Sequence, residues 1–169
     1  MRKLGIIAVL SLMALALAAV PALAAKAHFK PGSPQFTQAS DTTLDASGYL
    51  AGLGNYTTLV QVDATGTPDV TCTSPGGNES PGQNPGSVDV SGAQTIPATD
   101  VKNGNIFFDV VTQEPGAITG KQGGCPNNNW SATINSIDFT SATVYVYQDF
   151  NGDGTFSANE LVLKKTYTL

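Results

Sequence analysis

Apolar and polar residues alternate along almost every apolar segment of the chain after residue 58. The clearest cases are residues 60–64, 106–111, 143–147 and 161–169. Successive side chains of a β-strand point to opposite faces, so this period of two is typical of half-buried strands. No segment beyond residue 25 places apolar residues three and four apart, as an amphipathic helix requires. The sequence therefore predicts an all-β protein.

Turn-forming dipeptides separate these segments at short intervals. They contain Gly, Asn, Pro or Asp and occur at residues 46–48, 54–55, 66–68, 102–104 and 151–154. Short strands with turns at this spacing predict an antiparallel, immunoglobulin-like sandwich of two sheets and about seven to nine strands, over residues 35–169. A closed barrel is the alternative architecture.

One apolar segment changes phase along its length. Trp130, Ala132 and Ile134 share one face, whereas Ile137 and Phe139 fall on the other. An extra residue in a strand shifts the side chains behind it to the opposite face. We therefore expect a bulge or bend at residues 135–136.

Residues 1–25 have the three parts of a secretory signal peptide. Arg2 and Lys3 precede an apolar run over residues 4–20, and small residues follow, so cleavage is expected after Ala24 or Ala25. A retained membrane anchor is the alternative, since the run is nearly long enough to span a bilayer. Residues 26–34 are expected to be a flexible N-terminus. The predicted product is a secreted monomer with no membrane contact after the leader is removed.

The charge balance excludes one class of partner. Eight basic residues less Arg2 and Lys3 leave six against thirteen acidic residues, a formal charge of −7. Such a surface repels the phosphates of nucleic acids. The expected partner is an unidentified extracellular protein or glycan.

Two cysteines, Cys72 and Cys125, remain beyond the leader. Outside the cytoplasm two such residues usually pair, and one His is too few to complete a zinc site with them. Each lies in or beside a long segment rich in Gly, Pro and Asn, at residues 74–86 and 115–129. We expect one disulfide that holds these two loops at the same end of the sandwich.

The segment from Asp149 to Glu160 matches the twelve-residue calcium loop of EF-hands. The expected ligands of Ca²⁺ are Asp149, Asn151, Asp153, the carbonyl of Thr155, Ser157 and both oxygens of Glu160. Gly154 occupies the sixth position, where the chain turns sharply. The residues on both sides alternate like strands, so a true EF-hand, which needs two helices, is not expected.

An ion-free hairpin is the alternative for this loop, because Asn-Gly and Asp-Gly are the commonest hairpin dipeptides. It does not account for Asp149 and Glu160, which bring a second and third carboxylate to a short connection. Without a paired hand, the expected calcium affinity is in the range of extracellular modules, about 0.1 to 1 mM.

No catalytic set stands out, so we do not expect an enzyme. The single His, His28, lies near the leader and has no evident nucleophile to activate. A secreted hydrolase that acts on glycans with paired carboxylates is the alternative function. Its candidate acids are Asp63, Asp109, Glu114 and Asp138, none of which is favoured by spacing.

A weak ligand-binding candidate surrounds the single Trp. Trp130 follows Asn128 and Asn129, and aromatic and amide side chains together suit sugars or protein surfaces. The alternative is that Trp130 packs on the disulfide inside the sandwich, as in many β-sandwiches.

Several motifs resemble a group of small exported bacterial proteins of unassigned function. They are Gly52-Leu-Gly-Asn55, Thr71-Cys-Thr-Ser-Pro-Gly-Gly-Asn78, Pro81-Gly-Gln-Asn-Pro85 and Gly124-Cys-Pro-Asn-Asn-Asn-Trp130. The resemblance covers about residues 49–130 and the terminal hairpin. It implies an exported immunoglobulin-like sandwich and transfers no catalytic or binding residue. The calcium-type loop is not a general feature of that group.

Overall fold

The computed structural model describes residues 26–169, so the predicted signal peptide lies outside the described residues. Within this range the chain forms nine strands and two short 3-10 turns. The strands are β1 (His28–Phe29), β2 (Gln35–Gln38), β3 (Leu44–Ala51), β4 (Thr58–Thr73), β5 (Glu79–Pro81), β6 (Val88–Ile96), β7 (Ile106–Val111), β8 (Ser131–Gln148) and β9 (Leu161–Thr168). The 3-10 turns are η1 (Ala98–Asp100) and η2 (Ala158–Glu160).

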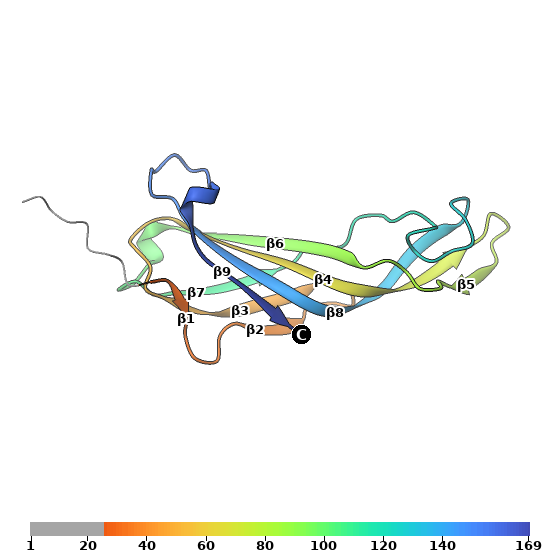
Figure 1. The fold of residues 1–169 in the computed structure, drawn as a ribbon, viewed down its shortest axis with the longest axis horizontal. Helices are drawn as coiled ribbons and strands as arrows, with labels where there is room; N and C mark the ends of the chain where they lie inside the picture. Colours follow the sequence, from red (N-terminus) through yellow and green to blue (C-terminus); the bar gives the residue numbers. More distant parts are fainter. Residues whose placement is uncertain (1–25) are drawn as a thin grey trace, which may run out of the picture.

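The strands form two antiparallel sheets, as the alternation predicts. In the first sheet β3 is central and pairs with β1, β2 and β7. In the second, β4 pairs with β5, β6 and β8, and β8 pairs with β9. Figure 1 shows the first sheet lying below the second over one half of the molecule.

The core lies where the two sheets face each other. Alternate residues of β3 and β7 point into it from one side, and alternate residues of β4 and β8 from the other. Fully buried members include Leu50, Val60, Val62, Phe108, Val144 and Val146. Removing such side chains from water contributes about 1.5 to 3 kcal/mol each, which makes the alternation the main determinant of this fold.

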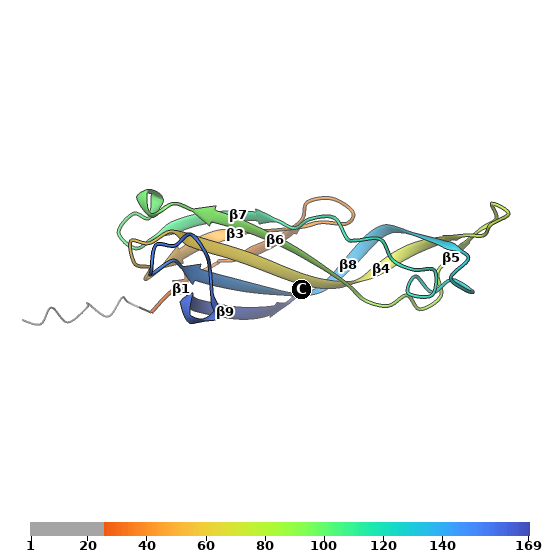
Figure 2. The same ribbon diagram turned by 90° about the horizontal axis from the view of Figure 1, so that it is seen from above.

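β4 and β8 extend well beyond the first sheet, which makes the molecule long (Figures 1 and 2). Their pairing runs from Thr58 opposite Gln148 to Thr73 opposite Ser131, whereas β6 leaves β4 after Gly66. Beyond that point the second sheet consists of β5, β4 and β8. The long loop before β8 packs there through a small cluster of Val70, Cys72 and Cys125. We call this part the extension.

The predicted bend in β8 is confirmed. Asp69 lies opposite Ser136 and Val70 opposite Ile134, so no residue of β4 lies opposite Asn135 in the register. A second register shift leaves Thr140 unpaired in the same way. These two bulges switch the face on which the apolar residues of β8 lie, first at Asn135 and again at Thr140.

The turn predicted at residues 66–68 is wrong, because β4 continues through it. Pro68 is buried in the strand opposite Ile137. β6 no longer flanks β4 at this point, so the missing N–H of Pro68 breaks no ladder on that side. A Cβ at Gly66 would lie 2.4 Å from Ile137. Gly66 and Pro68 therefore mark a point where β4 and β8 approach closely beside a bulge.

The expectation that residues 26–34 trail from the domain is also wrong. His28 and Phe29 pair with Ala51 and Leu50 of β3. Ala27 is buried, and the Phe29 ring packs against Phe108 with 6.0 Å between ring centroids. The alternation of apolar Ala27 and Phe29 about polar His28 is too short to stand out as a strand in the sequence. The segment nevertheless covers the end of the core.

The edges of the two sheets meet where β6 passes β7. The N–H of Gln113 donates to the carbonyl of Ser91 at 2.8 Å. A Cβ at Gly92 would lie only 2.4 Å from the carbonyl oxygen of Val111, so this approach requires Gly. No helix within residues 26–169 is long and apolar enough to cross a membrane.

Candidate functional site

The predicted calcium loop connects β8 to β9 and stands out at one end of the molecule (Figure 1). Tyr147 lies opposite Leu161 in the hairpin, so Asp149 and Glu160 occupy the two ends of the loop at its base. Both flanking elements are strands, with only the η2 turn before β9. The prediction that strands rather than EF-hand helices flank this loop is confirmed.

The loop is fixed to the β3–β4 connection. The N–H of Asp149 donates to the carbonyl of Thr57 at 2.9 Å. The buried amide of Gln148 accepts from the N–H of Gly54 and donates to its carbonyl, both at 3.0 Å. The Phe150 ring packs edge-on against Tyr56, 5.1 Å between centroids. These contacts give the loop a rigid base.

Asp149 is 8% exposed and is held by the loop's own backbone. Its two oxygens accept hydrogen bonds from the N–H groups of Gly152, at 2.7 Å, and Gly154, at 3.0 Å. Both glycines have positive φ, +72° and +76°, which other residues rarely adopt. A carboxylate has about four lone-pair positions, so each oxygen of Asp149 retains acceptor capacity for a cation.

Glu160 is 5% exposed and belongs to a capping box at η2. The N–H and Oγ of Ser157 both donate to its Oε2 at 2.9 Å. Its other oxygen, Oε1, is buried and has no hydrogen-bond partner. The Ser-x-x-Glu spacing is a known signature of this box, and our sequence analysis did not use it.

The middle of the loop is exposed and bonded to itself. Oδ1 of Asp153 accepts from the N–H of Thr155 at 2.8 Å and from its hydroxyl at 2.6 Å. These bonds, with the hydroxyl contributing most, hold the pKa of Asp153 below its usual value. The Asn151 amide donates to Oδ2 of Asp153 at 3.0 Å. Asn151 and Asp153 therefore face the loop backbone.

The structure thus places two of the predicted ligands at the two ends of the loop. Asp149 and Glu160 are buried at the base, and the Ser157 side chain is engaged by Glu160. Over residues 26–169 no three His, Cys, Asp or Glu side chains converge as a metal-binding group. The donors are hard oxygens of the type that Ca²⁺ prefers.

The predicted disulfide is present between Cys72 and Cys125, whose Cα atoms are 5.6 Å apart. It holds the loop before β8 against the extension, and the 74–78 turn lies at the same end (Figure 2). Trp130 packs against this cluster, as the alternative for this residue proposed. The Asn128 side chain accepts from the N–H of Lys121 at 3.0 Å, and Asn129 is exposed. The geometry gives Trp130 and Asn128 structural contacts.

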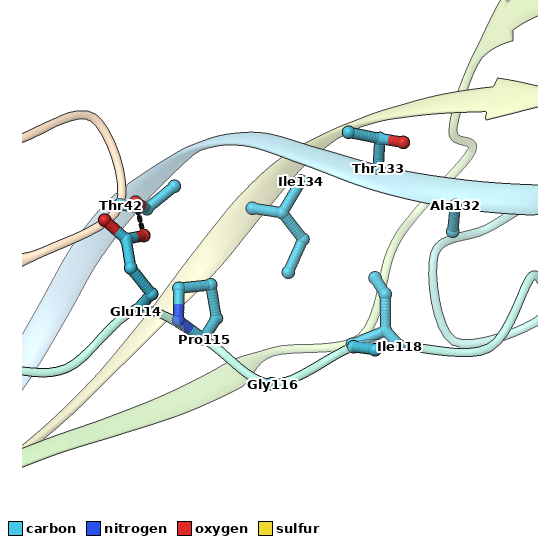
Figure 3. Close-up of a pocket in the computed structure, with 9 residues that line it drawn as sticks. Thr42, Glu114, Pro115, Gly116, Ile118, Ala132, Thr133 and Ile134 are labelled. Carbon is cyan, nitrogen blue, oxygen red and sulfur yellow. Dashed lines mark hydrogen bonds between the residues drawn. The ribbon is translucent and has the colours of Figure 1, made fainter.

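A hollow of about 280 Å³ lies where the main sandwich meets the extension (Figure 3). Ile118 and Ile134 line it, and the Glu114 carboxylate accepts a hydrogen bond from Thr42 at one end. Glu114 is the only acidic residue among its lining residues. A carboxylate-dependent hydrolase needs two acids that face each other, so this hollow does not provide its site.

One pair of acids missed by the sequence analysis lies on the outer side of β3 and β7. Burial raises the pKa of Asp45, and the charge of the nearby Asp109 raises it further. Oδ1 of Asp45 has no hydrogen-bond partner. Asp109 follows Asp45 by 64 positions, and only the β3–β7 register brings them together.

Comparisons of the chain with protein-family models, curated proteins and solved structures found no significant match. The resemblance to small exported bacterial proteins therefore stays a prediction.

Proposed function

We propose that this protein is an exported, non-enzymatic β-sandwich that serves as an extracellular binding or structural module, with one Ca²⁺ ion in its C-terminal hairpin loop. The observation that carries the calcium proposal is Glu160, which is 95% buried and has one carboxylate oxygen without a partner. It lies at the base of a loop that also buries Asp149.

A buried carboxylate oxygen without a donor destabilises the folded state by about 1 to 3 kcal/mol. A cation between Asp149 and Glu160 would remove that penalty and balance the two charges. Asp149 is already oriented by the N–H groups of Gly152 and Gly154. Ca²⁺ suits this position because it accepts six to eight oxygen ligands in a flexible geometry. Asn151, Asp153 and the Thr155 carbonyl would complete the set.

The acid pair on β3 and β7 is the observation that favours the alternative, a hydrolase. In retaining glycosidases the two carboxyl groups are about 5 to 5.5 Å apart, and in inverting enzymes about 6.5 to 9.5 Å. One oxygen of Asp45 is buried, so this pair does not present two open carboxyl groups to a substrate. This geometry supports a binding role over a catalytic one.

Export is proposed from the leader pattern at residues 1–25 and from the disulfide. Disulfides persist in oxidising compartments and are rare in the cytosol.

Thermal unfolding with and without calcium tests the ion site. At about 5 mM Ca²⁺ and a Kd near 0.5 mM, binding to the folded state adds about 1.4 kcal/mol, or about 5 °C in Tm for a domain of this size. Mg²⁺ at the same concentration should give a smaller shift, because it requires a tighter octahedral site.

Matched variants separate the site from general charge effects. Glu160→Gln and Asp149→Asn should abolish the calcium shift, and Asp138→Asn, which removes an exposed acid from β8, should retain it. Glu160→Gln should fold, since its amide can still accept from Ser157, and circular dichroism checks this. A wild-type Tm unchanged by calcium, or a shift that survives Glu160→Gln, would rule out this site.

A further inference from the structure

Two Asn-Gly pairs in the chain, Asn103-Gly104 and Asn151-Gly152, have the composition for spontaneous deamidation. In this reaction the backbone nitrogen of the glycine forms a bond to the side-chain carbonyl carbon of the asparagine. The bond from that carbon to the amide nitrogen breaks, and ammonia leaves with the proton of the glycine N–H. One water molecule then opens the cyclic imide at either carbonyl, which gives aspartate or isoaspartate. Glycine favours the attack because no side chain shields its nitrogen, and asparagine is accordingly a thermolabile residue.

The pair in the hairpin loop is held by three hydrogen bonds. The N–H of Gly152 donates to Oδ1 of Asp149 at 2.7 Å. The side-chain oxygen of Asn151 accepts from the N–H of Asp153, and its amide donates to Oδ2 of the same residue, both at 3.0 Å. Attack at Asn151 must break these bonds. It must also remove the proton of Gly152 beside the charge of Asp149, which disfavours the resulting anion.

The other pair forms the tip of a tight turn between η1 and β7. Lys102 and Asn105 close this turn with backbone hydrogen bonds of 3.0 Å in both directions. Asn103 has a φ of +51° and Gly104 a φ of +72°, the positive values that a type I′ turn requires. Asn103 is exposed. The asparagine side chain of this pair therefore projects from a two-residue tip.

The two groups that react are free at this tip. The carbonyl of Asn103 accepts from the amide of Asn105 at 2.8 Å, and the carbonyl of Gly104 accepts from the N–H of Leu53 at 3.1 Å. Over residues 26–169, however, no hydrogen bond involves the side chain of Asn103 or the N–H of Gly104. Exposed turns of this kind open locally at low cost in free energy. Such opening lets the side chain of Asn103 rotate toward the nitrogen of Gly104.

We propose that Asn103 is a site of spontaneous deamidation in the folded protein, and that the hairpin loop protects Asn151 from the same reaction. The modification adds a negative charge at residue 103, and isoaspartate also lengthens the backbone by one methylene group. Leu53, whose N–H donates to Gly104, is buried in the core, so the longer turn should loosen this contact. The inference depends on neither export nor calcium.

Peptide mass spectrometry of aged protein tests the proposal. The purified protein is kept in EDTA at mildly alkaline pH and physiological temperature, then reduced and digested with trypsin. Cleavage after Lys102, Lys121 and Lys164 places the two pairs in separate peptides, 103–121 and 122–164. Fragment ions distinguish Asn103 from Asn105, and enzymatic methylation detects isoaspartate. We expect Asn103 to react at least about tenfold faster than Asn151, because a hydrogen bond to a charged acceptor must break at Asn151.

Two controls separate the effect of structure from that of sequence. Asn103→Gly should form the same turn, because glycine adopts positive φ freely, and should leave peptide 103–121 unmodified at residue 103. In urea with reductant both pairs should react at rates within about twofold of each other, because the unfolded chain lacks the bonds that distinguish them.

Reaction at Asn103 no faster than at Asn151 in the folded protein would overturn the proposal. So would an Asn103 that stays intact in the folded protein while the unfolded chain reacts. The same ratio of rates in urea as in the folded protein would show that the sequence alone sets the difference, and would also overturn it.

Discussion

Removal of the disulfide by the double substitution Cys72→Ala and Cys125→Ala should destabilise the protein by about 4 to 5 kcal/mol. The bridge joins residues 53 positions apart. Closing a loop of that length removes about 14 cal/mol/K of entropy from the unfolded chain, which is about 4 kcal/mol at 25 °C. Loss of the two buried sulfur atoms from the cluster around Val70 adds about 1 kcal/mol. Total stabilities are about 5 to 15 kcal/mol, so this change is large.

Urea denaturation with two probes measures this effect. Trp130 packs beside the bridge, so its fluorescence reports on the extension, whereas far-UV circular dichroism reports on both sheets. We expect the Trp130 transition of the double variant to occur at lower urea than the dichroism transition, because the main core retains its own cluster. Wild-type protein with reductant should lose about 4 kcal/mol, and reductant should not affect the variant. A loss below about 1 kcal/mol in both samples would refute the entropy argument.

Two further predictions concern the packing and charge of the first sheet. Gly92→Ala should lower the free energy of unfolding, measured by urea denaturation, by about 2 kcal/mol or more, because its Cβ would lie 2.4 Å from a backbone oxygen. The control Gly116→Ala, whose Cβ would have no atom within 4 Å, should stay within about 0.5 kcal/mol of wild type. Equal effects of the two substitutions would contradict the close approach of β6 and β7. The folded state raises the pKa of Asp45 above its ordinary value of 3.8. The folded protein therefore holds the carboxyl proton of Asp45 more tightly than the unfolded chain does. The contribution of Asp45 to stability falls as the pH rises from 3.8 through the pKa of the folded state. Asp45→Asn should therefore stabilise the protein at pH 7 by about 1 kcal/mol, with the gain lost once the pH falls below about 3.5. A gain that persists at that pH would show that the charge of Asp45, which burial and Asp109 disfavour, is not its cause.

The class of fold follows directly from the sequence, because burial requires period-two alternation in every strand that faces the core. The phase change before Ile137 even locates the bulge at Asn135. The errors occur where tertiary context outweighs local preference. Gly66 and Pro68 have the composition of a turn, but the pairing of β4 with β8 extends the strand through them. The pairing of His28 and Phe29 depends on β3, which lies some twenty residues away.

The candidate sites also differ in how far the sequence predicts them. The calcium loop is local in sequence, so its donors and its turn glycines are readable from spacing. The burial of Asp149 and Glu160 depends on the hairpin base and on Thr57, and no pattern within the loop encodes it. The pair of Asp45 and Asp109 joins residues 64 positions apart through strand register alone. Single-sequence analysis assigns such residues to strands without indicating their cross-strand neighbours.

Isothermal titration calorimetry with CaCl₂ tests the central claim, that the buried carboxylates at the hairpin base bind a cation. The account predicts one ion per chain with a Kd of about 0.1 to 1 mM, and no measurable binding heat in Glu160→Gln. Absence of heat from the wild-type protein at millimolar calcium would contradict it, and so would the same isotherm for Glu160→Gln.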